Sequence, residues 1–290
     1  MLLLVKHNEI VLYILTKLYK YDFILCIDVL TKGGGSMDKT AVGHIAVGAI
    51  VYRRANPDEI FICTKDLTYP HKVWRGCLCL IGGNWMRTRA DIDLSPLATF
   101  KREVREELSL IKSLQSTEEL EETSKVGVPF SYRVGEQDRR ITSQNVTELE
   151  IVKTAIMLNA KLFDDYIVVV PRHVFLRGDP QSIQDDMVIL LCVFEVPLAE
   201  DVWALLVRLQ DDFGNLSCES ESRILFMEEM VACNVAAVAG HDVALQQFFE
   251  AKGISGGCAV PIDEDIVVRR APMHPLPFYK DYLRYYDIAQ

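Results

Sequence analysis

Residues 102–110 read REVREELSL, and their charge pattern is the most informative local feature of the chain. Glu103, Glu106 and Glu107 stand at positions i, i+3 and i+4. In an α-helix such positions fall within an arc of about 100° on one face, so the carboxylates would share one side. The segment therefore predicts a helix with an acidic face.

The start of this helix is also marked in the sequence. Ser95 can cap the first turn through its side chain, and Pro96 is tolerated at the first helical position. An apolar stripe on the other side predicts packing against a core, and it is formed by Leu97, Ala98, Val104 and Leu108.

The acidic face has two interpretations. It is either a solvated surface partly balanced by Arg102, which stands four residues before Glu106, or a site for a divalent cation. Carboxylate oxygens are hard ligands that suit Mg²⁺ or Mn²⁺, and a bound ion would turn repulsion among the glutamates into binding.

The order of residues favours the second interpretation. With Gly82-Gly83 upstream, the segment resembles the signature of the Nudix hydrolase family: Gly, five residues, Glu, seven residues, then Arg-Glu-aliphatic-x-Glu-Glu-x-Gly-aliphatic. In that family the signature forms a loop-helix-loop on an α/β/α sandwich. The resemblance implies a metal site for Mg²⁺ or Mn²⁺ formed by Glu103, Glu106, Glu107 and Gly83.

The resemblance also implies that Arg102 orients the carboxylates through a charge-assisted hydrogen bond. The chain departs from the family pattern in three places. Leu94 stands where the family has Glu, with Asp91 and Asp93 nearby as substitutes; the loop 84–93 is enlarged; and Ser109 replaces the Gly that ends the helix, which makes a left-handed termination less easy.

The implied function is metal-dependent hydrolysis of a diphosphate linkage in a nucleoside diphosphate joined to another moiety, with Arg102 and the three glutamates as catalytic residues. Trp74 and Arg75 are candidates for stacking on a base and binding phosphate, and Glu219 and Glu221 for the general base. Two alternatives are a non-catalytic nucleotide sensor or interaction protein, and an enzyme resembling isoprenyl-diphosphate isomerases.

The remaining sequence alternates between strand and helix patterns. Apolar runs at 41–53 and 59–63, separated by Asn56-Pro57-Asp58, predict a β-hairpin, and 74–81 is a further apolar segment. Helices are predicted at 149–162, 200–209 and 243–251, and strands at 166–170, 187–196 and 223–226. We therefore expect an α/β (α+β) fold: a Nudix-type α/β/α sandwich with a mixed sheet, plus an insertion and an N-terminal extension.

We expect one catalytic domain at 37–256, with an insertion at about 112–147 and a C-terminal extension at 257–290. Residues 1–36 are either sequence upstream of a true start at Met37, or an amphipathic helix with a flexible Gly/Ser linker.

The amino-acid composition limits the kinds of molecule that the protein is expected to bind. A net charge of −10 opposes binding to extended nucleic acid but permits a small phosphorylated ligand, because a metal ion and local cations can reverse the sign within one cleft. Eight cysteines without paired CxxC motifs indicate buried free thiols, and neither a membrane-spanning run nor a signal peptide is recognised. We expect a cytoplasmic protein that does not bind membranes, and a homodimer is the usual state in the family.

Overall fold

The computed structural model describes residues 42–67, 69, 71–85, 93, 95–110, 130–134, 137–176, 186–218, 220–233, 236–256 and 259–271. The predictions for residues 1–36, for most of the insertion and for the end of the C-terminal extension lie outside these ranges.

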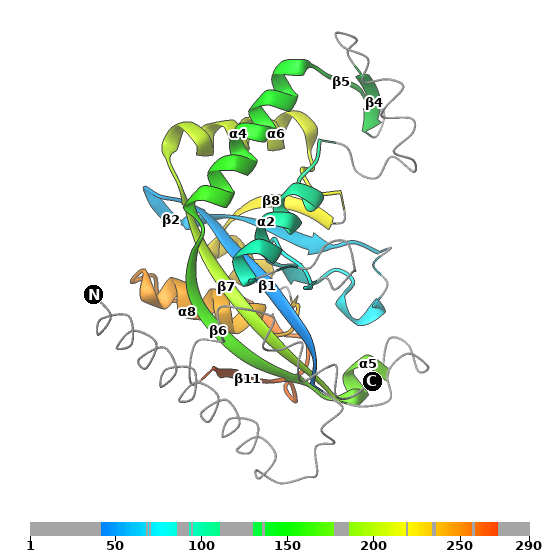
Figure 1. The fold of residues 1–290 in the computed structure, drawn as a ribbon, viewed down its shortest axis with the longest axis vertical. Helices are drawn as coiled ribbons and strands as arrows, with labels where there is room; N and C mark the ends of the chain where they lie inside the picture. The colour runs from blue at the N-terminus through cyan, green and yellow to red at the C-terminus, as the bar shows by residue number, and fades with distance from the viewer. Residues whose placement is uncertain are drawn as a thin grey trace, which may run out of the picture.

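A mixed sheet forms the middle of the molecule (Figure 1). Its strands are β1 (Val42–Arg53), β2 (Asn56–Lys65), β3 (Leu78–Cys79), β6 (Lys161–Val170), β7 (Met187–Leu198), β8 (Ser220–Phe226), β9 (Ala236–Ala237), β10 (Val260–Pro261) and β11 (Val267–Arg270). The strand order is β10-β9-β3-β2-β1-β7-β6-β11, and β8 pairs with β2.

Strand β1 sets the character of this sheet, because its two neighbours run in different directions. It is antiparallel to β2, with Val51 opposite Phe61, and parallel to β7, with Val47 opposite Cys192. The hairpin formed by β1 and β2 confirms the sequence prediction. The turn was misplaced, however, since β2 already begins at Asn56 and the connection is made at Arg54 and Ala55.

Helices cover both faces of the sheet. They are α2 (Pro96–Glu107), α4 (Ser143–Asn159), α5 (Arg172–Leu176), α6 (Glu200–Phe213), α7 (Met227–Cys233) and α8 (His241–Ala251), with a 3-10 turn η1 (Lys72–Trp74). Side chains alternate across β2, so that Phe61 packs under α2, α4 and α6 while Ile60 packs under α8. The predicted α/β/α sandwich with a mixed sheet is confirmed.

The buried layer beneath α2, α4 and α6 contains Trp203 and Leu206. Phe100 of α2 stacks on Phe194 of β7, with 5.2 Å between the ring centroids, and this contact fixes the helix on the sheet.

Several boundaries differ from the sequence predictions. The expected insertion at about 112–147 contains, in its described part, a hairpin of β4 (Phe130–Val134) and β5 (Gln137–Ile141), and the start of α4. Helix α4 begins early because Thr142 and Asn145 form a reciprocal capping box. Within the apolar segment 74–81 the strand is β3, and Trp74 belongs to η1.

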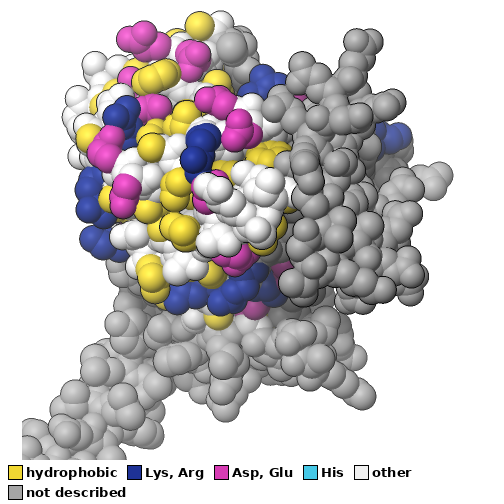
Figure 2. Space-filling view, turned by 90° about the horizontal axis from the view of Figure 1, so that it is seen from above, with side chains coloured by type: hydrophobic (Ala, Val, Ile, Leu, Met, Phe, Trp, Pro, Cys, Tyr) yellow, Lys and Arg dark blue, Asp and Glu magenta, His cyan; other side chains and the backbone are white. Residues whose placement is uncertain are grey.

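The buried thiols are confirmed for the cysteines whose side chains are described: Cys63, Cys77, Cys79 and Cys192 are buried, and Cys218 is partly buried. On the face seen in Figure 2, Lys and Arg side chains are interspersed with acidic and hydrophobic ones over the described residues, as on an ordinary polar surface.

The cap of α2 gives a stability prediction. The Ser95 hydroxyl accepts a hydrogen bond of 3.1 Å from the Ala98 backbone amide. We expect Ser95→Ala to lower the free energy of unfolding by about 1 kcal/mol, since one orphan amide loses its partner. Urea denaturation measures this. Ser143→Ala is the control, because Thr142 caps that helix, and an equal loss in both variants would contradict the prediction.

Candidate functional site

The three glutamates of α2 lie in two environments. Glu103 and Glu107 are buried, with exposed fractions of 7% and 4%. The Glu106 side chain is half exposed at 50%. The predicted acidic face is therefore not a uniformly solvated surface, because two of its carboxylates turn inward toward the loop that carries Gly82 and Gly83.

That loop follows β3 and is held against β1 by backbone hydrogen bonds. The Ala49 amide donates to the Ile81 carbonyl at 2.8 Å, and the Val47 amide donates to the Gly83 carbonyl at 2.9 Å. The Gly82 amide points the other way and donates to Glu107 Oε2 at 3.0 Å. The loop thus joins the sheet to the inner carboxylate of α2.

Both glycines are required by close approach. A Cβ on Gly83 would lie 2.5 Å from the Glu103 carboxyl carbon, so any side chain would displace that carboxylate. Gly82 has a φ of +147°, and a Cβ there would lie 2.1 Å from the Val47 carbonyl oxygen. The Gly-Gly pair therefore lets the carboxylates sit directly against the loop backbone.

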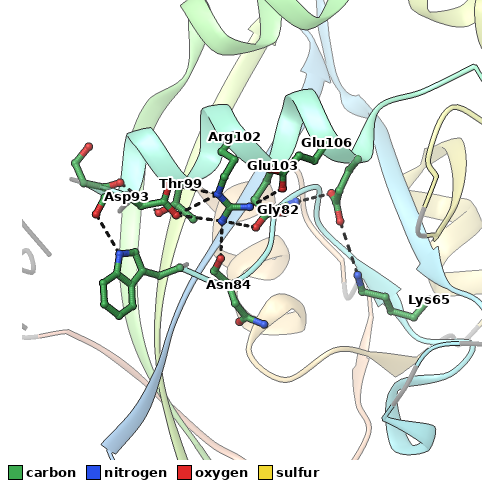
Figure 3. A network of polar contacts seen from close by, with 11 residues as sticks. Lys65, Gly82, Asn84, Asp93, Thr99, Arg102, Glu103 and Glu106 are labelled. Atoms are coloured by element: carbon green, nitrogen blue, oxygen red, sulfur yellow. Dashed lines mark hydrogen bonds and ion pairs between the residues drawn. The ribbon is translucent and has the colours of Figure 1, made fainter. Parts of the chain in front are cut away.

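Arg102 is the hub of the polar network (Figure 3). Its Nη1 donates to Glu106 Oε2 at 2.6 Å, and its Nη2 lies 2.8 Å from Glu103 Oε1. Nη2 also donates to the Asn84 carbonyl at 2.8 Å. Burial alone would lower the pKa of Arg102, but its hydrogen bonds to Asp93 and Glu106 and the charge of Glu103 raise it.

Asp93 also binds the Arg102 guanidinium. Its carboxylate accepts hydrogen bonds from Arg102 Nε at 3.3 Å and Nη2 at 3.1 Å, and its backbone carbonyl accepts one from Trp85 Nε1 at 3.1 Å. Asp93 is buried, with 8% exposed. Of the two aspartates considered as substitutes for the missing Glu, Asp93 contacts Arg102, whereas Asp91 and Leu94 lie outside the described residues.

The substitution Arg102→Lys tests whether Arg102 acts through the shape of its guanidinium group or through its charge alone. Lysine keeps the charge but lacks the planar fork that serves several acceptors at once, so we expect a loss of about 2 kcal/mol in the free energy of unfolding. Denaturant titration measures it. Arg105→Lys, at an exposed position of the same helix, is the matched control, and no difference between the two variants would refute the hub role.

The C-terminal end of α2 is fastened by the connection between α6 and β8. The Glu107 carbonyl accepts a hydrogen bond of 2.9 Å from the Cys218 amide, and the Ser109 amide donates to the Leu216 carbonyl at 2.9 Å. The helix stops at Leu108 in an extended conformation. Ser109 is therefore compatible with this end, because the C-cap residue Leu108 is extended and not left-handed.

Lys65 was not predicted from the sequence. It is buried at the end of β2, and its Nζ lies 3.9 Å from Glu107 Oε1 and 4.8 Å from the Tyr69 ring centroid. Burial by itself would lower the pKa of Lys65, but the negative charges that Cys79 and Glu107 carry when ionised outweigh this and raise it. The available signal was a lysine at an inward position of an alternating strand, after Phe61 and Cys63.

The donor set has the chemistry that suits a hard divalent cation, but its carboxylate oxygens do not all converge. Among the described residues, the three side chains whose ligand atoms all lie within 4.8 Å of one another are His173, Asp263 and Asp265. Asp93, Glu103, Glu106 and Glu107 provide carboxylate oxygens, and Arg102 and Lys65 provide the nearby positive charges, which leaves a formal charge of −2 over these six residues. Gly83 lets the Glu103 carboxylate lie against the loop backbone, because a Cβ would stand 2.5 Å from the carboxyl carbon. Oxygen donors with an excess of negative charge suit Mg²⁺ or Mn²⁺.

The other predicted residues have contacts of their own. Trp74 is buried and packs edge-on against Phe175, with 5.8 Å between the ring centroids, and Arg75 Nε donates to the Tyr69 carbonyl at 2.8 Å. Glu221 pairs with Thr64 of β2, which places its side chain on the sheet face opposite to Lys65. Glu219 lies outside the described residues. The substrate-binding roles of Trp74 and Arg75 stay predictions.

Similarity to known proteins is found among solved structures. No family model matches the chain, and no curated protein matches it significantly. Solved structures with similarity include the MutT protein from Methanosarcina mazei Go1, at 15% identity and a TM-score of 0.31, covering 72% of this chain and 91% of that one. A bifunctional NMN adenylyltransferase/ADP ribose pyrophosphatase from Francisella tularensis, at 12% identity and a TM-score of 0.23, covers 72% and 39%.

These solved structures are MutT/Nudix-type proteins. Within the described part of the chain, no helix is long and apolar enough to cross a membrane.

Proposed function

We propose that the chain is a metal-dependent hydrolase that cleaves the diphosphate linkage of a nucleoside diphosphate joined to another moiety. The observation that carries the proposal is the burial of the Glu103 and Glu107 carboxylates against the Gly82-Gly83 loop, beside an arginine that contacts Glu103 and Glu106. A purely structural acidic helix face would turn its carboxylates to water, because burying several like charges is costly.

In this proposal Glu103, Glu106 and Glu107 hold Mg²⁺ or Mn²⁺ together with Gly83. A bound ion would supply charge neutralisation at the phosphoryl oxygens and lower the pKa of a coordinated water. Arg102 keeps Glu103 in position through an ion pair and Glu106 through a hydrogen bond, and the Gly82 amide holds Glu107 by a hydrogen bond. The protein contributes mainly the placement of these groups.

Trp74 and Arg75 are proposed to contact the nucleotide, the partner being a small diphosphate and not an extended nucleic acid. A cytoplasmic location and a homodimer are parts of the same proposal, carried over from the family resemblance.

The test is a hydrolysis assay on the full chain over a panel of nucleotide diphosphates, each with Mg²⁺, Mn²⁺ or a chelator. The proposal expects turnover that needs the metal and releases two phosphate-containing fragments. Binding of a nucleotide without turnover would indicate that the protein is a nucleotide sensor and not an enzyme. Conversion of an isoprenyl diphosphate without release of a phosphate-containing fragment would point to an isomerase instead.

A further inference from the structure

Lys65 places a fixed positive charge beside one of the proposed metal ligands. Its Nζ lies 3.9 Å from Glu107 Oε1, and both side chains are buried, at 11% and 5% exposure. Glu107 is thereby contacted on both oxygens, since Oε2 accepts the Gly82 amide. Figure 3 shows Lys65 reaching toward the C-terminal end of α2, away from the side where Arg102 contacts Asp93.

Glu107 is the carboxylate among the described groups whose negative charge raises the pKa of Lys65, which also include Cys79, Tyr69 and Cys63. Burial raises the pKa of the Cys79 thiol to about 12 and that of Cys63 well above its usual value, so both are neutral. Burial and the Lys65 charge lower the pKa of His241 to about 3, and its Nδ1 accepts a hydrogen bond from the Leu80 amide. His241 is neutral as well.

An ammonium and a divalent ion compete for the same carboxylate. Two like charges a few ångströms apart in a buried site repel strongly, because little water screens them. At the same time, a buried Glu107 without a cation would be costly. Lys65 therefore stabilises the metal-free protein but weakens its binding of a divalent ion.

We propose that Lys65 is a positioning residue of the carboxylate cluster: its ammonium holds Glu107 in place when no metal is bound and lowers the affinity of the cluster for a divalent ion. This inference rests on the metal site of the proposed function. A diphosphate substrate carries negative charge that would offset the charge of Lys65. The site should therefore bind its metal ion more tightly when substrate is bound.

The test is a titration of the metal-free full chain with Mn²⁺ alone, following free Mn²⁺ by electron paramagnetic resonance. Lys65→Met should bind Mn²⁺ at least about tenfold more tightly, because a repelling charge is removed. Lys65→Arg keeps the charge and should stay within about threefold of the wild type. Lys72→Met, at an exposed position, is the control for loss of a lysine.

The direction of the change separates this proposal from a purely structural role. A lysine that merely supports the fold would, when removed, disorder Glu107 and weaken Mn²⁺ binding, so weaker or unchanged binding in Lys65→Met overturns the proposal. If Lys65→Met is too unstable to titrate, Lys65→Gln is used, and the Mn²⁺-induced rise in Tm should exceed that of the wild type. An equal or smaller rise overturns the proposal too.

Glu103→Gln in the same titration tests the metal site itself. If Glu103→Gln leaves the affinity for Mn²⁺ unchanged, the metal binds elsewhere and the proposed function is wrong. If Glu103→Gln abolishes binding while Lys65→Met leaves it unchanged, the metal site stands and only the role of Lys65 is rejected.

Discussion

Glu107→Gln is expected to lower kcat/KM for metal-dependent diphosphate hydrolysis by about 10³-fold, because charge stabilisation by a bound ion is worth several kcal/mol of the barrier. The substitution keeps the shape of the side chain and its acceptor oxygen for the Gly82 amide, but removes the charge. Glu106→Gln is expected to lose activity as well, since it removes a second ligand. Steady-state kinetics with Mg²⁺ and Mn²⁺ measures both.

The matched control is Glu150→Gln, on an exposed face of α4 where the glutamate pairs with Lys153. This variant should retain wild-type turnover. Circular dichroism must show that all variants are folded. Full activity in a folded Glu107→Gln protein would remove the helix carboxylates from the mechanism and leave the metal-site assignment without support.

Gly82→Ala is expected to lower the free energy of unfolding by about 3 kcal/mol or more, the largest stability effect of the single substitutions considered. The added Cβ would meet the Val47 carbonyl oxygen at 2.1 Å, and that oxygen belongs to the backbone of the central strand β1. A backbone atom cannot rotate away as a side chain can, so the loop must move and take its hydrogen bond to Glu107 with it.

Gly214→Ala separates the steric contribution from the cost of a positive φ. Gly214 ends α6 with a φ of +72°, but a Cβ there would meet no atom within 4 Å. We expect it to cost about 1 kcal/mol, the usual penalty for a left-handed non-glycine residue. Urea denaturation compares the two variants, and equal losses would show that the close approach to Val47 is unimportant.

The elements that sequence reasoning predicted well are those specified by local signals. Helix α2 has a capping serine, a proline at its first position and a regular apolar stripe, and it begins where these place it. The first hairpin follows from β-branched runs. Its turn was misplaced because Asn56 and Pro57, ordinary turn formers, are used as the first residues of β2.

Elements without such signals were missed. The segment 126–147 is polar, and its hairpin and helix start are recognisable only through the pairing of Phe130 with Ile141 and the Thr142 cap. Helix α7 is short and follows β8 without a break, so its periodicity is too brief to distinguish from the end of a strand.

In the site, too, some features were predicted from local sequence signals and others were not. The spacing of the glutamates gave their common helix, but it could not indicate that Glu106 stays half exposed while Glu103 and Glu107 are buried, because that depends on where the Gly82-Gly83 loop lies. Lys65 comes from a different strand, forty-two positions before Glu107 in the chain. Such a pair is formed by the fold alone.

The fastening of α2 by the connection after α6 has a consequence for how the protein is made. Cys218, whose thiol and amide bind the carbonyls of Glu106 and Glu107, follows Glu106 by 112 residues. At ordinary rates of synthesis this separation corresponds to roughly 5 to 20 seconds on the ribosome. During that interval the nascent chain carries the acidic helix without its anchor, so the proposed metal site is completed late, after residues 216–218 have left the exit tunnel.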